Sequence, residues 1–135
     1  MSQRAKYSIK FGSIKIQFPR CIKIIDKPID VDCIEALSGI IHCDYIIRFV
    51  LNDMYFCLIV EDTSLPELKD IKKIEKCYEY FIRQSDKGTI VIKLLHFKRG
   101  ARAPILKLAS KNKVELFKCT KTIDVEQILR KRNFL

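Results

Sequence analysis

The sequence predicts an α/β fold in which a mixed central sheet is flanked by helices, and three patterns support this prediction. Polar and apolar residues alternate over residues 6–25, as is typical of strands. Two runs rich in β-branched and aromatic residues flank Asn52-Asp53, which predicts a tight hairpin. Helical and strand-like segments alternate from residue 64 onward, which favours a layered α/β architecture.

Length and composition predict one domain of 135 residues, with 48% apolar and 31% charged residues. Within it we expect N-terminal strands at 6–25, a core at about 30–120 and a C-terminal helix at 122–133. No stretch approaches the roughly 18 apolar residues that a membrane helix needs, and no apolar signal core follows the N-terminus. We therefore expect a cytoplasmic protein with no membrane partner.

The remaining elements follow from local signals. Ser64 and Glu67, with Pro66 between them, form a typical helix start. The six cysteines include no C-x-x-C pair and mostly lie in apolar runs, so we expect buried thiols and no zinc site. Helices are expected at about 30–41, 64–83, 104–110 and 122–133, and further strands at 89–97 and 113–119.

The predicted hairpin would bring two acids together. If Leu51 pairs with Met54, the register sets Asp44 directly across from Glu61. Directly opposed Cβ atoms in an antiparallel pair lie about 4.5–5.5 Å apart. Two carboxylates at that distance repel each other unless a proton or a cation lies between them. A divalent metal ion with oxygen ligands is the natural candidate.

The net charge of +10 favours a polyanionic partner, above all nucleic acid. The alternative is a lysine-rich, solvated surface without a specific partner. A basic loop follows the apolar segment at 89–97, and its residues Lys98, Arg99 and Arg102 are the candidate nucleic-acid contacts. Taken alone, the loop is equally compatible with an ordinary solvated connection.

The order strand, turn, strand, helix, strand over residues 42 to about 119 resembles the PD-(D/E)XK nuclease superfamily, whose fold is restriction-endonuclease-like. In that family an aspartate begins one core strand, and the next strand ends in (Asp/Glu)-x-Lys. Asp44 matches the aspartate and Glu61 matches the acid. The lysine position holds Thr63, which cannot supply a positive charge.

This resemblance implies a nuclease that uses Mg²⁺ or Mn²⁺ on nucleic acid, with DNA as the expected substrate. It implies Asp44 and Glu61 as metal ligands and Glu35 as an auxiliary acid. A lysine from elsewhere would replace the missing cation, because a long flexible side chain reaches the same point in space. The candidates are Lys69, Lys73 and Lys93.

Several alternatives remain open at this level. Thr63 is equally compatible with a catalytically inactive nucleic-acid-binding module or a partner-binding protein. Asp44 would then cap a turn, and Glu61 would belong to a solvated loop before Ser64. His96 is expected to be a satisfied core histidine. Small nuclease domains often act in pairs, so a homodimer is a further possibility that the sequence does not decide.

Overall fold

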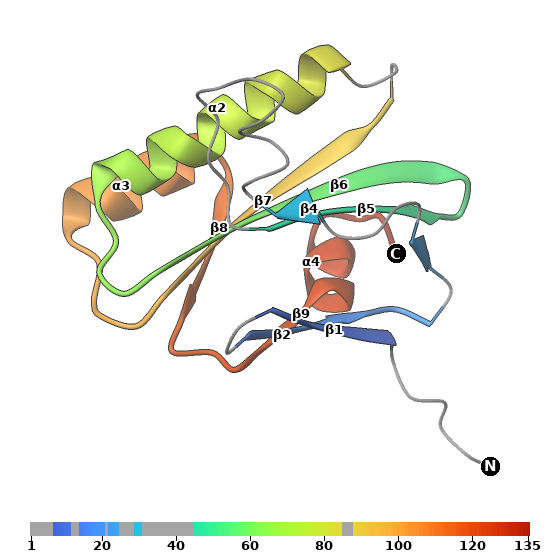
Figure 1. Cartoon of the computed structure of the whole chain (residues 1–135), viewed down its shortest axis with the longest axis horizontal. Coiled ribbons are helices and arrows are strands. Elements are labelled where there is room, and N and C mark those ends of the chain that lie inside the picture. The colour runs from blue at the N-terminus through green and yellow to red at the C-terminus, as the bar shows by residue number, and fades with distance from the viewer. Residues whose placement is uncertain (1–6, 12–13, 21, 25–28, 31–44, 85–87) are drawn as a thin grey trace. The chain divides into compact units, whose positions relative to one another are not determined.

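The computed structural model describes residues 7–11, 14–20, 22–24, 29–30, 45–84 and 88–135 (Figure 1). The chain divides into two compact units. The smaller unit combines Met1–Ile22 with Thr120–Leu135, and the larger unit is Lys23–Cys119. Both units contain a mixed sheet, so the predicted α/β class is confirmed at that level.

The smaller unit is a three-stranded sheet with one helix. Strand β1 (Tyr7–Phe11) runs antiparallel to β2 (Ile14–Phe18), and β2 runs parallel to β9 (Thr122–Asp124). Helix α4 (Val125–Lys131) follows β9 directly. The N-terminal strands agree with the predicted alternation over residues 6–25. The helix predicted at 122–133 is wrong for its first three residues, which form β9 because they pair with β2, and α4 begins at Val125.

One apolar layer holds this unit together. Alternate residues of β2 are fully buried, as expected for a strand with one face on a core. The Asp124 side chain accepts a 3.0 Å hydrogen bond from the Glu126 N–H and so caps α4. The buried apolar residues of the layer are Ile14, Ile16, Phe18, Ile123, Val125, Ile128 and Leu129.

The larger unit contains a six-stranded sheet in which an antiparallel hairpin is extended by two strands parallel to its second strand. The hairpin strands β5 and β6 are antiparallel, whereas β6, β7 and β8 are parallel to one another. The order across the sheet is β3 (Lys23–Ile24), β5 (Tyr45–Leu51), β6 (Met54–Thr63), β7 (Ile90–Phe97) and β8 (Val114–Lys118), and β4 (Ile29–Asp30) also pairs with β5.

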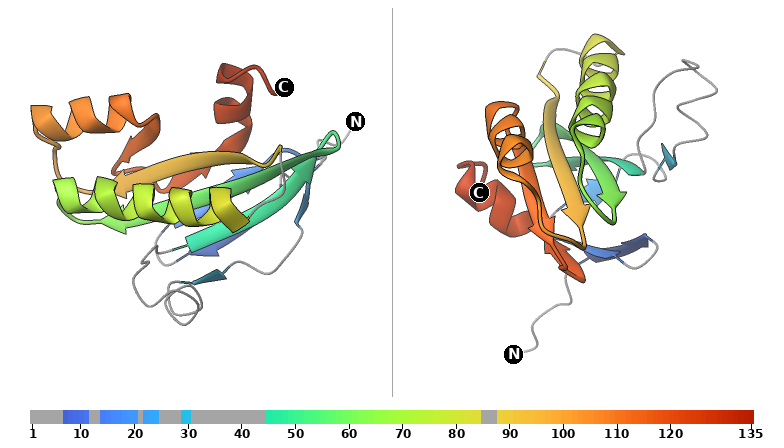
Figure 2. Two further views of the ribbon diagram at one scale, coloured as in Figure 1. Left: turned by 90° about the horizontal axis from the view of Figure 1, so that it is seen from above. Right: turned by 90° about the vertical axis from the view of Figure 1, so that its left-hand side faces the viewer.

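Helices α2 (Leu68–Gln84) and α3 (Ala103–Lys111) connect the parallel strands and lie side by side over one face of the sheet (Figure 2). Their apolar faces share one cluster with the strands beneath them. Among the helices that the structure describes, none combines the length and apolar character needed to span a lipid bilayer. The cluster includes Ile46, Cys57, Ile59, Ile71, Ile74, Cys77, Leu95, Phe97, Ile105, Ala109 and Val114.

The predicted hairpin and its register are confirmed for the described residues. Leu51 pairs with Met54, and the pairing continues to Tyr45 opposite Val60. Asn52 and Asp53 both have positive φ angles, 50° and 62°, as a tight two-residue hairpin turn requires. The turn therefore sets which residues face each other along both strands.

The helix predicted at 64–83 begins later than expected. The Glu67 N–H donates a 2.8 Å hydrogen bond to the Asp70 side chain, and the helix starts at Leu68. Glu67 therefore precedes the helix in the position predicted for Ser64, and Asp70 in the first turn accepts its N–H as in a capping box. The predicted elements at 89–97, 104–110 and 113–119 are present as β7, α3 and β8. The predicted helix at 30–41 lies outside the described residues.

Replacing Asp53 with glycine should stabilise the hairpin. The left-handed conformation costs a residue with a Cβ atom more than it costs glycine. We expect Asp53→Gly to raise the free energy of unfolding by about 0.5–1 kcal/mol in urea denaturation. As a control, Lys107→Gly in the exposed face of α3 should lower it by about 1 kcal/mol. A loss of stability in Asp53→Gly would contradict the role given to this turn.

Candidate functional site

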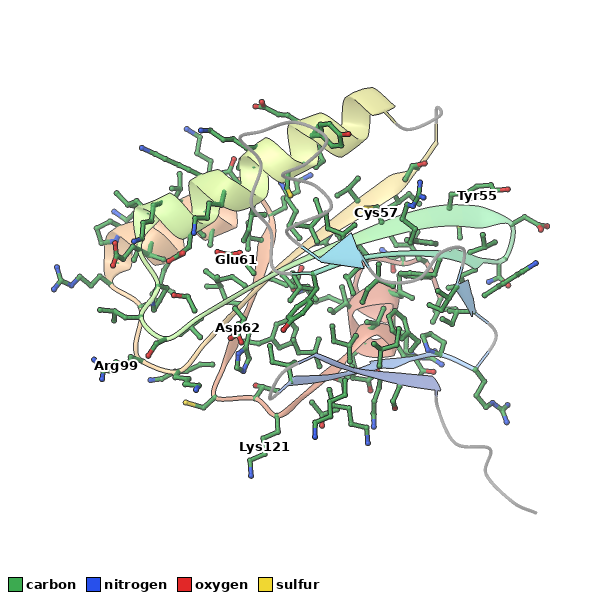
Figure 3. The ribbon with its side chains drawn as sticks, viewed as in Figure 1. Tyr55, Cys57, Glu61, Asp62, Arg99 and Lys121 are labelled. Carbon is green, nitrogen blue, oxygen red and sulfur yellow. The ribbon has the colours of Figure 1, made fainter. Side chains whose placement is uncertain are left out.

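Glu61 is a buried carboxylate near the end of β6, only 4% exposed. Residues alternate between the faces of a strand, so Glu61 shares a face with Cys57 and Ile59, beneath α2. Burial of a charge is costly unless an opposite charge or hydrogen bonds compensate for it. Figure 3 shows Glu61 between the sheet and the helix. A carboxylate kept in this position needs a positive neighbour.

Lys73 of α2 supplies that neighbour. Its Nζ lies 3.7 Å from Glu61 Oε2, and its side chain is 41% exposed. The separation exceeds ordinary hydrogen-bond length, so the contact is an ion pair and not a direct hydrogen bond. One end of the pair is buried and the other reaches solvent. The ammonium group is therefore partly accessible to an anion from solvent.

The other two candidate lysines are engaged elsewhere. Lys69 lies 3.8 Å from Glu67 on the exposed surface of the helix start. Lys93 is buried, 2.9 Å from Glu75 and 4.4 Å from the ring centre of Tyr78. A cation held between a carboxylate and an aromatic ring serves packing between β7 and α2. Of the three lysines, the structure brings Lys73 to Glu61.

Thr63 occupies the position at which the resembled family has its lysine. It ends β6 on the same face as Glu61. Its Oγ1 donates a 3.4 Å hydrogen bond to the carbonyl of Leu65. The side chain thus helps to turn the chain toward α2, and its hydroxyl brings no charge to the site.

The two other acids of the predicted site, Asp44 and Glu35, lie outside the described residues. The placement of Asp44 opposite Glu61 therefore stays a prediction. Within the described ranges, no group of three or more His, Cys, Asp and Glu residues has the arrangement of a metal centre. Glu61 by itself offers the oxygen ligand that Mg²⁺ or Mn²⁺ prefers.

A second polar pair lies on the opposite face of the sheet. Asp62 pairs with His96 across the parallel strands, and His96 Nδ1 lies 2.8 Å from Asp62 Oδ1. His96 is 4% exposed. It is a buried histidine whose polar group is satisfied, in agreement with the sequence-based expectation. The sequence did not reveal its partner, because that pairing depends on the register between β6 and β7.

The basic loop after β7 is tied to the loop after β6. The N–H groups of Lys98 and Arg99 both donate to the Ser64 carbonyl, at 3.1 and 2.9 Å. The side chains of both residues are exposed, and Figure 3 shows Arg99 at the margin of the unit. Next to them, Lys118 Nζ lies 3.7 Å from the position that a Cβ at Gly100 would take. Several cations therefore gather where β7 and β8 end.

The smaller unit presents a basic sheet face of its own. Lys10 and Lys15 are direct partners across β1 and β2, and both are exposed. The Lys15 N–H donates to the carbonyl of exposed Lys121 at 2.8 Å, just before β9 begins. Like charges directly opposite each other destabilise a sheet. An arrangement that costs stability in this way is suited to an anionic partner.

The cysteines differ from one another in state. Cys57 is a free, buried thiol, and Cys119 is free and exposed, with its Sγ donating to the Lys98 carbonyl. Cys77 is disulfide-bonded. The expectation of buried thiols is therefore wrong for Cys77, which is not a thiol, and for Cys119, which is exposed. A pattern of spacings along the chain does not show which cysteines meet in space.

In comparisons with known proteins, no family model, no curated protein and no solved structure matches this chain.

The two free cysteines should differ sharply in reactivity. Burial raises the pKa of Cys57 from 9.0 to about 12, although the charge of Arg48 acts in the opposite direction. Near pH 8 we expect Cys119 to be alkylated at least about tenfold faster than Cys57. Peptide mapping of the alkylated protein measures the two rates. Because Cys57 ionises more easily in the unfolded chain, its contribution to stability should fall as the pH rises above about 9. Equal labelling of both thiols in the native protein would contradict the burial of Cys57.

Proposed function

We propose that this protein binds nucleic acid and hydrolyses its phosphodiester bonds with Mg²⁺ or Mn²⁺, as a nuclease of the PD-(D/E)XK type. The observation that carries the proposal is the pairing of buried Glu61 with Lys73 at the end of β6. The pair belongs to a hairpin followed by a helix and a strand, which is the element order of the resembled family; these elements are β5, β6, α2 and β7. Lys73 would supply the positive charge of the family's lysine, whose position is occupied by Thr63 in this chain.

In this proposal Glu61 holds the metal ion together with Asp44, and Glu35 adds an auxiliary acid. When bound, the ion would supply an activated water and stabilise negative charge on the scissile phosphate. The Lys73 ammonium would hold a nonbridging phosphate oxygen or orient the water molecule, because it lies beside the carboxylate and reaches solvent. Burial of Glu61 keeps its carboxylate in one position before the substrate arrives.

Nucleic acid is the proposed partner because of where the positive charges lie. Exposed Lys98, Arg99 and Arg102 follow β7, at the same sheet edge at which β6 leads out of the Glu61 site. Arginines on such a loop suit bidentate contacts to phosphate. In the smaller unit, the opposed pair Lys10 and Lys15 adds a second basic face. DNA is the proposed substrate.

A second candidate is a catalytically inactive nucleic-acid-binding module, and Thr63 favours it. The Thr63 hydroxyl is used in a turn, and its position holds no cation. A module of this kind would retain salt-dependent binding without cleavage. A cytoplasmic location and a homodimer that brings two sites to two strands remain further proposals.

Plasmid nicking separates the two candidates. With Mg²⁺ or Mn²⁺, the wild type should nick supercoiled DNA, and Glu61→Gln should slow nicking at least roughly 100-fold because a ligand oxygen is lost. Lys73→Met should slow it about 100-fold by removing the cation. Circular dichroism checks that both variants are folded.

Lys69→Met is the matched control, because Lys69 lies on the same helix but pairs with exposed Glu67. It should nick within about twofold of the wild type. Nicking that survives in Glu61→Gln would contradict the proposed site. The absence of metal-dependent nicking in the wild type, with binding intact, would favour the inactive module.

Reversing one charge on the basic sheet face should have opposite effects on stability and on binding. Lys10→Glu replaces a repulsive pair with an attractive one, so we expect a gain of about 0.5 kcal/mol in unfolding free energy. The same change should weaken duplex DNA binding and reduce the slope of log K against log salt by about 1. Fluorescence anisotropy at several salt concentrations measures both the affinity and the slope.

The control is Lys23→Glu, an exposed position on β3 with the same change in charge. Its effect on the salt slope should be smaller. Equal effects of the two substitutions would show that net charge, and not the Lys10 face, determines binding.

A further inference from the structure

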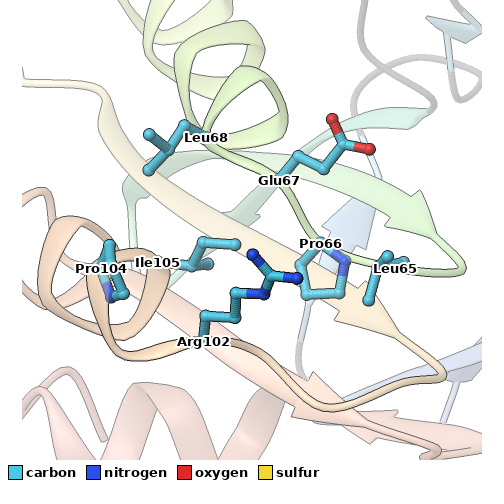
Figure 4. Close-up of a pocket in the computed structure, with 7 residues that line it drawn as sticks. All are labelled: Leu65, Pro66, Glu67, Leu68, Arg102, Pro104 and Ile105. Atoms are coloured by element: carbon cyan, nitrogen blue, oxygen red, sulfur yellow. The ribbon is translucent and has the colours of Figure 1, made fainter.

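A pocket of about 410 Å³ lies between the loop that leads from β6 into α2 and the start of α3. Its volume is within the range of small-ligand sites. Pro66 and Ile105 are buried, whereas Leu65, Leu68 and Pro104 are exposed. The pocket is lined by Leu65, Pro66, Glu67, Leu68, Arg102, Pro104 and Ile105 (Figure 4).

The polar groups of the pocket are unequal. Figure 4 shows the Arg102 guanidinium extending toward Pro66, while the Glu67 carboxylate points away from the apolar walls. Glu67 is also paired with Lys69 at 3.8 Å. Arg102 makes no ion pair with any other described residue. The pocket therefore combines apolar walls with one available cation, a combination that suits an anion with an apolar part.

The walls are held in place before any ligand arrives. The Ser64 carbonyl accepts hydrogen bonds from the N–H groups of both Lys98 and Arg99, which joins the two loops that form the pocket. The Arg102 carbonyl accepts from the N–H groups of Ile105 and Leu106, at 3.0 and 3.1 Å, which fixes the first turn of α3. A pocket that is already formed loses little conformational entropy on binding.

Three of the exposed large apolar side chains of the described chain lie here or close by. Leu65, Leu68 and Leu106 are each 45% exposed. The first two line the pocket, and the third lies on α3 outside it. An apolar surface with one available cation beside it suits a nucleotide, in which a flat base adjoins a phosphate.

We propose that this pocket holds one unpaired nucleotide of single-stranded DNA, with the base against Leu65 and Leu68 and a phosphate on Arg102. The proposal rests on the nucleic-acid part of the proposed function and names its substrate class. In a duplex the base edges are paired and stacked, so a base enters such a pocket only when it is unpaired or flipped out. The protein should therefore prefer single strands, gaps or frayed ends to an intact duplex.

The test is fluorescence anisotropy with a short labelled single strand and the matching blunt duplex, in EDTA so that no cleavage occurs. The wild type should bind the single strand about tenfold more tightly than the duplex. The double variant Leu65→Ala/Leu68→Ala should lose about five- to tenfold in single-strand affinity and keep its duplex affinity. Arg102→Gln should weaken single-strand binding by a similar factor.

Leu106→Ala is the matched control, since Leu106 has the same exposed fraction as Leu68 and lies outside the pocket. It should leave both affinities unchanged. Equal affinity of the wild type for single strand and duplex, or unchanged single-strand binding in the double variant, would overturn the proposal. Sedimentation analysis adds one more test. If the wild type is a dimer and the double variant is a monomer, a second copy of the chain fills the pocket and the proposal is overturned.

These results are independent of the nuclease proposal. Loss of single-strand preference in the pocket variants, with no nicking by the wild type, would support the pocket and overturn the metal-dependent cleavage. Nicking that depends on Glu61, together with unchanged binding in the Leu65 and Leu68 variants, would support the nuclease and overturn the pocket proposal.

Discussion

The burial of the Glu61 carboxylate next to the Lys73 ammonium is the constraint on which the functional interpretation depends. An acid at the end of a solvated strand would need no explanation. An acid that is 4% exposed beneath a helix must recover the lost hydration from its neighbours. The Lys73 ammonium, 3.7 Å away and partly in solvent, supplies one opposite charge to this carboxylate. We interpret the pair as functional because it places an oxygen ligand beside a cation that reaches solvent.

The sheet places the remaining features near this pair. Because β6, β7 and β8 are parallel, their carboxyl ends lie along one edge of the larger unit. The Glu61 site, the basic loop at Lys98 and Arg99, and the pocket beside Arg102 all form close to that edge. Ligand sites commonly occur at this edge of an α/β sheet, where loops meet and the strands hold them rigidly. The sheet alone specifies no chemistry, so the proposed function depends on the residues at this edge.

Much of the backbone could be predicted from the sequence because its signals are local. The turn at Asn52 and Asp53 sets the hairpin register, so the pairing from Tyr45 to Val60 follows from two residues. The strand at β9 could not be predicted, because it forms by pairing with β2, which is distant in the sequence. The start of α2 was misplaced because Ser64 has the sequence pattern of a cap, and only the folded chain shows that the Glu67 N–H bonds to Asp70 in the first turn.

The candidate site could be predicted only in part, for a similar reason. Position along the chain identified Glu61 but could not choose between Lys69, Lys73 and Lys93. The choice depends on how Ile71 and Ile74 pack α2 against the sheet, because this packing determines which lysine lies next to Glu61. The pocket beside Arg102 left no sequence signal, because its walls come from two segments that are distant in the sequence and are joined in the fold, in part through the Ser64 carbonyl.

Nuclear magnetic resonance with added Mn²⁺ tests the central claim most directly, since a bound paramagnetic ion broadens the amide signals around its ligands. Substoichiometric Mn²⁺ should broaden the backbone amides of Glu61 and its strand neighbours first, and Glu61→Gln should abolish that selectivity. Uniform broadening, or broadening centred on exposed acids such as Asp53, would contradict a metal site at the end of β6.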